Sequence, residues 1–220
     1  MKNFTFIFVL FLNFLQSDNL FAQKKPQSVA VIVNLINGDS LQGTTRLQKG
    51  WVKGNFTGTS VSNKIEVKTT DSWKTKIYKP NDITGYTLVF KDGREARFFS
   101  SDHSSLVPKD LKDLFRKPTF LLYVAGKTLK DFRRFYTILI SGSGPQTSSG
   151  EEVFLVKNDN EVFDFSSRGS DNEVKWRKRL WEFLAECPDL VEKIKPGLFH
   201  TYPSNLICQD YDKCVSDLKN

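Results

Sequence analysis

Apolar and polar positions alternate along most of the chain in short runs, as expected of half-buried β-strands. The first run, Ser28 to Ile36, ends at the turn pair Asn37-Gly38, and the alternation resumes from Ser40 to Leu47. Asn-Gly between two strand-like runs is a strong signal for a tight hairpin turn. The pattern therefore predicts that a β-hairpin opens the folded part of the chain.

The clearest meander is predicted between residues 73 and 99. Strand-like runs in this stretch are separated by the turn residues Pro80-Asn81-Asp82 and then by Asp92-Gly93. Both groups combine residues that favour turns for different steric reasons. Three neighbouring antiparallel strands are the expected result.

The next part of the chain continues in the same way. Residues 119–141 are expected to form two or three strands that turn at Gly126, and residues 152–165 predict one last hairpin. Between them, the stretch 142–150 is rich in glycine and serine, which predicts a flexible loop.

The pattern changes to a helical period near Ser170. Ser170 and Glu173 have the spacing of a capping box, which predicts an amphipathic helix to about Glu186. Pro188 is expected to open a second short helix, and a third is predicted over residues 205–218. The buried stripe of the first helix is expected to contain Val174, Leu180, Trp181, Leu184 and Cys187.

Together these elements predict an α+β fold, in which an antiparallel meander sheet or open barrel is followed by a short C-terminal helical segment. The expected organisation is a signal peptide over residues 1–22, a β-rich domain over 23–168, and a helical segment over 169–220 packed on it. Helices this short are marginal alone and gain most of their stability from packing, which is why the sheet is their expected support.

The N-terminus has the features of an export leader. Lys2 supplies a positive charge, and the segment Phe4–Leu15 is apolar apart from two positions. About 12 apolar residues suit a signal peptide and fall short of the ~20 that a membrane-spanning helix needs. We expect cleavage after Ala22, with Gln23 as the first mature residue; an uncleaved anchor is the alternative. The expected location is the periplasm, the outer membrane surface or the extracellular space.

Export would place the three cysteines, Cys187, Cys208 and Cys214, in an oxidising compartment. Cys208 and Cys214 are six residues apart, so on one helix they would point in different directions and could not bridge. We therefore favour a Cys187–Cys214 disulfide over Cys187–Cys208, with buried free thiols as the alternative. The cysteine spacing does not suit a metal site, and no motif calls for a cofactor.

The formal charge of +7 comes from dispersed lysines and arginines, with clusters only at residues 131–136 and 175–181. Dispersed cations are typical of solvated strand and helix faces. They would also attract a polyanion such as an acidic envelope polysaccharide or a lipid surface. Export disfavours nucleic acid as the partner.

Motifs that suggest catalysis are weak. The stretch Val124–Thr128 reads VAGKT, but a phosphate-binding loop needs glycine where Leu121 stands. One of the two histidines, His103, follows Asp102 in a serine-rich loop and could shuttle a proton in a hydrolytic site. Adjacent polar residues do not establish a triad, so the sequence predicts no catalytic residue.

Large aromatic side chains are spread over the predicted strands. Most are expected in the core, where large rings dominate burial. If Trp51, Trp73 and Tyr86 share one concave face, they would suit a sugar or an apolar ligand.

The segments NGDSLQG (37–43), IYKPNDITGY (77–86) and KDGREARFF (91–99), with FLAECPDLVEKI (183–194) and NLICQDYDKC (205–214), resemble a group of small exported bacterial proteins of unknown function. The resemblance covers most of the chain after the leader, and it implies an exported, envelope-associated protein. Its motifs are turn and packing signals, so it supplies no catalytic residues.

The sequence leaves three functions open. The first is a non-catalytic exported protein that binds a ligand or partner in the envelope or outside the cell. The second is a hydrolase with a site near His103. The third is a barrel that binds a lipid or another apolar ligand.

Overall fold

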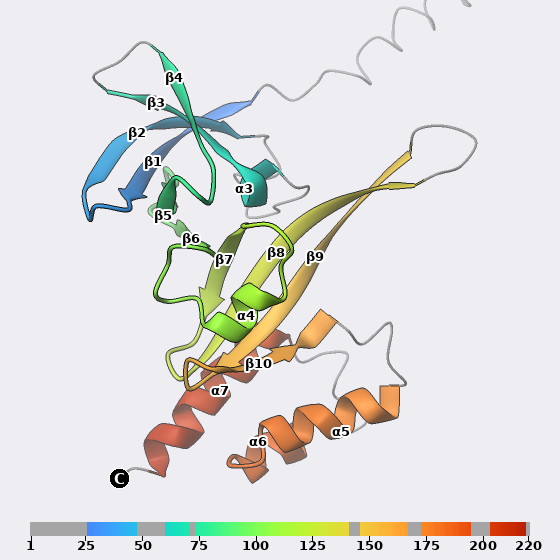
Figure 1. Cartoon of the computed structure of the whole chain (residues 1–220). Helices are drawn as coiled ribbons and strands as arrows, with labels where there is room; N and C mark the ends of the chain where they lie inside the picture. The colour runs from blue at the N-terminus through green and yellow to red at the C-terminus, as the bar shows by residue number, and fades with distance from the viewer. Residues whose placement is uncertain are drawn as a thin grey trace, which may run out of the picture.

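The computed structural model describes residues 26–47, 60–70, 74–140, 146–166, 173–194 and 203–218 (Figure 1). The expected leader, the Ser170 cap, Trp51 and Trp73 lie outside these residues. The strands are β1 Gln27–Leu35, β2 Ser40–Leu47, β3 Ile65–Thr69, β4 Thr75–Tyr78, β5 Ile83–Val89, β6 Glu95–Ser100, β7 Phe120–Ala125, β8 Leu129–Ile140, β9 Gln146–Lys157 and β10 Glu161–Asp164. The helices are α3 Ser60–Asn63, α4 Lys109–Asp113, α5 Glu173–Phe183, α6 Pro188–Lys193 and α7 Ser204–Asp217.

The strands form one antiparallel sheet in the order β10-β9-β8-β7-β6-β5-β1-β2-β3-β4. Two meanders, β1 to β4 and β5 to β10, are joined side by side through the β1–β5 pair. The predicted α+β class with an antiparallel meander sheet is confirmed. The sheet curls into a half-barrel (Figure 1).

The short β4–β5 connection explains the curl. In a flat sheet β4 and β5 would lie four strand spacings apart, about 19 Å. The chain from Tyr78 to Ile83 reaches about 17 Å when fully extended, and it is shortened further by a turn in which Asp82 N–H donates to the Lys79 carbonyl. The sheet must therefore bend to bring β4 back toward β5.

Both predicted hairpin turns of this half-barrel form. Gly38 has φ +93° between β1 and β2, and Gly93 has φ +81° between β5 and β6. A positive φ is easily adopted by glycine, which explains why the sequence turns at these positions. The register that follows, Asn34 opposite Ser40 and Val89 opposite Glu95, sends alternate side chains of β1 and β5 into the half-barrel.

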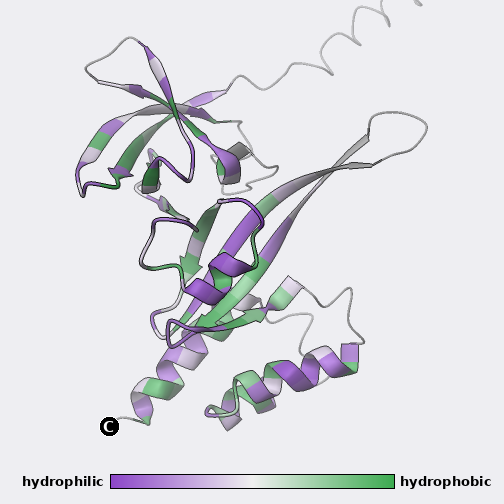
Figure 2. Cartoon of the chain, in the orientation of Figure 1, coloured by the Kyte–Doolittle hydropathy of each residue, from purple (hydrophilic) through white to green (hydrophobic). Residues whose placement is uncertain are grey.

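The core of the half-barrel is built from inward side chains of β1 to β8, together with Phe90 and with Val61 of α3. Figure 2 shows hydrophobic and hydrophilic positions interspersed along these strands. Its buried members are Val29, Val31, Val33, Leu47, Val61, Ile65, Val67, Tyr78, Ile83, Tyr86, Leu88, Phe90, Ala96, Phe98, Phe120, Leu122 and Phe135. β-Branched and aromatic residues of this kind fit a pleated, half-buried surface, so propensity and burial agree here.

The C-terminal helices pack beside the other half of the sheet. They share a core with Leu129, Leu155 and Phe163, to which α5 and α7 contribute Trp176, Leu180 and Ile207 among others. Within the described ranges, no helix combines the length and apolar character needed to cross a membrane.

The buried face of α5 differs from the predicted stripe. Val174 is 73 % exposed, whereas Trp176 is fully buried together with Leu180 and Leu184. The buried residues follow a spacing of four, so the face passes through Trp176. The expected burial of Val174 was wrong because that position lies about 200° around the helix from Trp176.

Candidate functional site

Tyr86 is the one residue of the expected ligand-face aromatics that lies in the described part of the chain. It is 1 % exposed, its ring stacks on Phe98 with centroids 4.6 Å apart, and its hydroxyl donates to the Val61 carbonyl at 2.6 Å. Burial raises the pKa of Tyr86 well above its ordinary value. Its expected place on a ligand face is therefore corrected: Tyr86 stands at the centre of the half-barrel core.

The loop around His103 is joined to the preceding turn by contacts from side chains to main-chain carbonyls. His103 Nε2 lies 3.0 Å from the Asn81 carbonyl and 3.4 Å from Asp102 Oδ2. The buried Ser100 hydroxyl donates to the Pro80 carbonyl at 2.7 Å and accepts the N–H groups of Asp102 and His103. The Ser100 hydroxyl thus donates its hydrogen bond to a main-chain carbonyl and not to the His103 imidazole. Ser100 and His103 are therefore not arranged as a serine nucleophile and its general base.

Cys187 and Cys214 are joined by a disulfide, the pairing that the sequence favoured. Cys208 is free and fully buried. Burial, and then the nearby carboxylates of Asp131 and Asp212, raise the pKa of the Cys208 thiol well above its ordinary value. A buried thiol of this kind is not a reactive nucleophile.

The VAGKT stretch forms the β7–β8 turn, and its amides are already occupied. Asp212 of α7 accepts the N–H of Lys127 at 2.6 Å, of Thr128 at 2.8 Å and of Leu129 at 3.2 Å. Successive amides that point together form a concave anion site. In this chain that site holds an internal carboxylate, which fastens α7 to the sheet.

A second polar contact fixes the start of α7. The carboxylate of Asp131 on β8 is fully buried, accepts the Ser204 hydroxyl at 2.6 Å, and forms an ion pair with Arg133 at 3.1 Å. Buried carboxylates are tolerated when they are paired and hydrogen-bonded. Asp131 therefore holds α7 against β8.

The end of the α5 region is held by Lys157 of β9. Its ammonium donates to the Phe183 carbonyl at 2.8 Å and to Glu186 at 3.0 Å, and the Tyr211 hydroxyl donates to the same carboxylate. These polar groups bind one another and have a structural role. Among the described residues, no group of His, Cys, Asp and Glu side chains is arranged to hold a metal ion.

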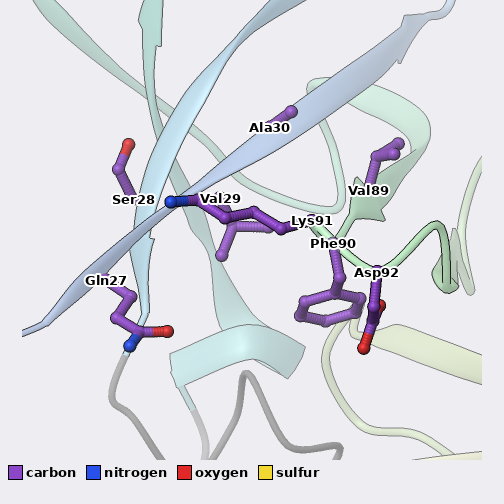
Figure 3. A pocket seen from close by; sticks show the side chains of 8 residues that line it. All are labelled: Gln27, Ser28, Val29, Ala30, Val89, Phe90, Lys91 and Asp92. Atoms are coloured by element: carbon purple, nitrogen blue, oxygen red, sulfur yellow. The ribbon is translucent and has the colours of Figure 1, made fainter.

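A groove lies on the half-barrel where β1 and β5 separate. Strand pairing between them begins at Ala30 opposite Val89. The preceding residues of β1 pair only with β2, and the chain after Val89 turns toward β6. The resulting β1–β5 groove has a volume of about 730 Å³ and is lined by Gln27, Ser28, Val29, Ala30, Val89, Phe90, Lys91 and Asp92 (Figure 3).

The lining of the β1–β5 groove is largely apolar, with polar groups at its rim. Val29 and Phe90 are core residues whose edges reach the groove, and Ala30 and Val89 lie on the outer face of the sheet. Figure 3 shows the Phe90 ring beside Asp92, and the Lys91 side chain extending from the turn in the direction of β1.

The rim of the β1–β5 groove carries one carboxylate, Asp92, and one ammonium group, Lys91. The Asp92 carboxylate accepts a hydrogen bond from Arg94 at 2.8 Å, and this bond lowers the pKa of Asp92. Lys91 is exposed and forms no ion pair within the described residues. The rim is therefore cationic, although one carboxylate belongs to it.

Sequence reasoning missed the β1–β5 groove. The sequence did contain one signal for this groove. The outward positions of the first strand carry small residues, Ser28 and Ala30, which leave space beside larger neighbours. The groove itself depends on the point at which β1 and β5 cease to pair, and these strands are about fifty residues apart in the sequence.

Comparison of the chain with protein-family models, with curated proteins and with solved structures finds no match. The site must therefore be interpreted from its own geometry.

Proposed function

We propose that this chain is an exported, non-catalytic binding protein of the cell envelope or the extracellular space, which holds a ligand with an apolar part in the β1–β5 groove. The observation that carries the proposal is the groove lining, in which Val29, Ala30, Val89 and Phe90 supply apolar surface. Ligand sites are commonly hollows of this size, lined by apolar side chains with a few polar groups that orient the ligand.

The position of the groove supports the same function. Its walls are strands of a sheet whose inner face is fully packed, so the lining is held rigidly. A rigid lining lowers the conformational entropy that is lost when a ligand binds.

The disulfide supports an extracytoplasmic location. Structural disulfides persist in oxidising compartments and are rare in the cytosol, where thiols are kept reduced. The Cys187–Cys214 bond therefore fits the leader that the sequence predicts over residues 1–22.

The test is to fill the groove. Ala30→Trp places an indole on the exposed wall, and Val124→Trp is the matched control, since Val124 is also partly exposed but lies on β7. The wild-type protein and the Val124→Trp variant should bind the neutral apolar dye N-phenyl-1-naphthylamine, with at least tenfold weaker binding by Ala30→Trp.

Circular dichroism should show that both variants are folded. A second variant, Val89→Arg, places a charge on the opposite wall and should weaken dye binding in the same way. Equal dye binding by wild type and both groove variants would contradict the proposal. Absence of dye binding by the wild-type protein would contradict it as well.

A further inference from the structure

A second groove lies on the neighbouring side of the β1–β2 hairpin, where β2 and β3 separate. These strands pair only at Gly43 with Thr69 and at Thr44 with Lys68. The β2–β3 groove has a volume of about 550 Å³ and is lined by Ser28, Thr44, Thr45, Arg46, Glu66, Lys68 and Thr75. Hydroxyl and charged groups dominate this lining, in contrast to the β1–β5 groove.

The β2–β3 groove favours an anion. Its single carboxylate, Glu66, forms an ion pair with Lys64 at 2.6 Å. Arg46 is exposed and makes no contact with a carboxylate in the described part of the chain. A guanidinium beside hydroxyl groups is well suited to bind a carboxylate or phosphate.

The two grooves meet across the first hairpin. Ser28 lines both of them, and it lies directly opposite Arg46 in the β1–β2 register. The next outward pair joins Ala30, of the apolar groove, to Thr44, of the polar groove. Directly opposed residues have Cβ atoms about 5 Å apart. A single ligand can therefore contact both linings without crossing a wide surface.

We infer that the two grooves form one site for an anionic amphiphile, whose apolar chain lies in the β1–β5 groove and whose acidic headgroup binds Arg46 in the β2–β3 groove. This inference rests on the proposed function, and it adds the chemical class of the ligand. Lys91 at the rim of the apolar groove adds a second cation, and the net charge of +7 favours the same sign of ligand.

Three probes separate the two parts of the site. Dodecyl phosphate carries both a chain and an acidic headgroup, dodecyl maltoside carries the same chain with a neutral headgroup, and inorganic phosphate carries no chain. Binding is measured by titration calorimetry below the critical micelle concentration at low ionic strength. Dodecyl phosphate should bind at least about tenfold more tightly than either of the other probes.

The headgroup contact is tested with Arg46→Gln. The control is Arg116→Gln, which removes the same charge from an exposed position after α4. Arg46→Gln should weaken the binding of dodecyl phosphate roughly threefold to tenfold. This decrease corresponds to the usual energy of an exposed, charge-assisted hydrogen bond. It should leave dodecyl maltoside binding unchanged, and Arg116→Gln should alter neither.

The outcomes distinguish this inference from the proposed function. If Arg46→Gln has no effect on dodecyl phosphate while dodecyl maltoside and the neutral dye still bind, the anionic class is overturned and the apolar groove stands. If inorganic phosphate binds as tightly as dodecyl phosphate, the site recognises anions without a chain, as an acidic polysaccharide would require, and the inference is overturned. If neither amphiphile nor the dye binds, the proposed function fails as well.

Discussion

Gly126 stands at the turn between β7 and β8, where the chain turns beside α7. Its φ is +91°, and a Cβ added there would lie 1.6 Å from the Leu129 carbonyl oxygen. The turn must hold its amides toward Asp212, so this geometry also decides how α7 is attached. Glycine is thus required at position 126 for two reasons: its φ is positive, and there is no room for a Cβ atom.

Gly126→Ala is expected to lower the free energy of unfolding by more than about 2 kcal/mol, since it combines a left-handed residue with a backbone clash. The control is Gly93→Ala, whose φ is +81° but whose added Cβ would meet open space. That variant should lose only about 1 kcal/mol. Urea denaturation of both variants measures the difference, and equal losses would refute the role of the clash.

Asp212 is the second residue whose removal should have a large effect. Asp212→Asn replaces one acceptor oxygen by an amide that faces N–H donors, leaving at least one amide of the turn unsatisfied. A loss of about 2 kcal/mol is expected, with faster hydrogen exchange at Lys127 to Leu129. Asp217→Asn makes the same charge change at an exposed position of α7 and should be nearly neutral. Unchanged exchange in Asp212→Asn would show that the turn does not depend on this carboxylate.

At the scale of elements, the disulfide constrains α7 relative to the end of α5. It links two residues that are 27 positions apart in the sequence, and replacing both Cys187 and Cys214 by serine should cost about 3.5 kcal/mol of stability. Cys208 should not react with a thiol reagent in the folded protein, and one thiol per chain should react after denaturation without reductant. Three reactive thiols under those conditions would contradict the bond.

The Lys157–Glu186–Tyr211 contacts give the same region a pH dependence. Burial would raise the pKa of Glu186, but the hydrogen bonds from Tyr211 and Lys157 outweigh it and lower the pKa below its usual 4.5. A lowered pKa in the folded state means that the stabilisation is complete above the unfolded value and is lost as the pH falls through the folded value.

Glu186→Gln should therefore lower stability at neutral pH and remove part of the decline that the wild-type protein shows below pH 4.5. The measurement is urea denaturation at pH values from neutral to acidic. Glu182→Gln is the control, because Glu182 has only a 3.9 Å contact with Lys178 at the surface. Parallel stability profiles for wild type and Glu186→Gln would exclude this carboxylate as a source of the acid sensitivity.

At the scale of the whole molecule, one continuous sheet connects the half-barrel to the helical segment. β8 contributes Phe135 to the half-barrel core, Phe132 to the core beneath α4, and Leu129 to the core shared with the helices. These cores are therefore connected through one strand rather than through a linker. The predicted β-rich domain and the predicted helical segment are therefore both supported by β8.

Export is a prediction that concerns the whole molecule. The leader predicts that protein recovered from the envelope fraction or the medium begins at Gln23, after cleavage behind Ala22. Amino-terminal sequencing of the natural product, with cell fractionation, measures this. Recovery of the bulk of the protein inside the cell with Met1 still present would contradict both the leader and the proposed location.

Much of the fold followed from local patterns. Alternating apolar positions located the β1–β2 and β5–β6 hairpins because strand burial has a period of two, and Asn37-Gly38 and Asp92-Gly93 marked turns that need a positive φ. Residues 146–150 were wrongly assigned to a loop by their composition. They form the start of β9 because pairing with β8, from Ile140 opposite Gln146 onward, outweighs the low strand propensity of glycine and serine.

The sequence by itself determined the antiparallel α+β class, the turns and the favoured cysteine pair, because each depends on residues close in the chain or on the geometry of one helix. Only the tertiary structure decided that β1 lies between β2 and β5, that Tyr86 is buried, and that Asp212 fills the amide site of the β7–β8 turn. The two grooves belong to this second group. They exist where distant strands stop pairing, and that point is set by the curl and register of the whole sheet.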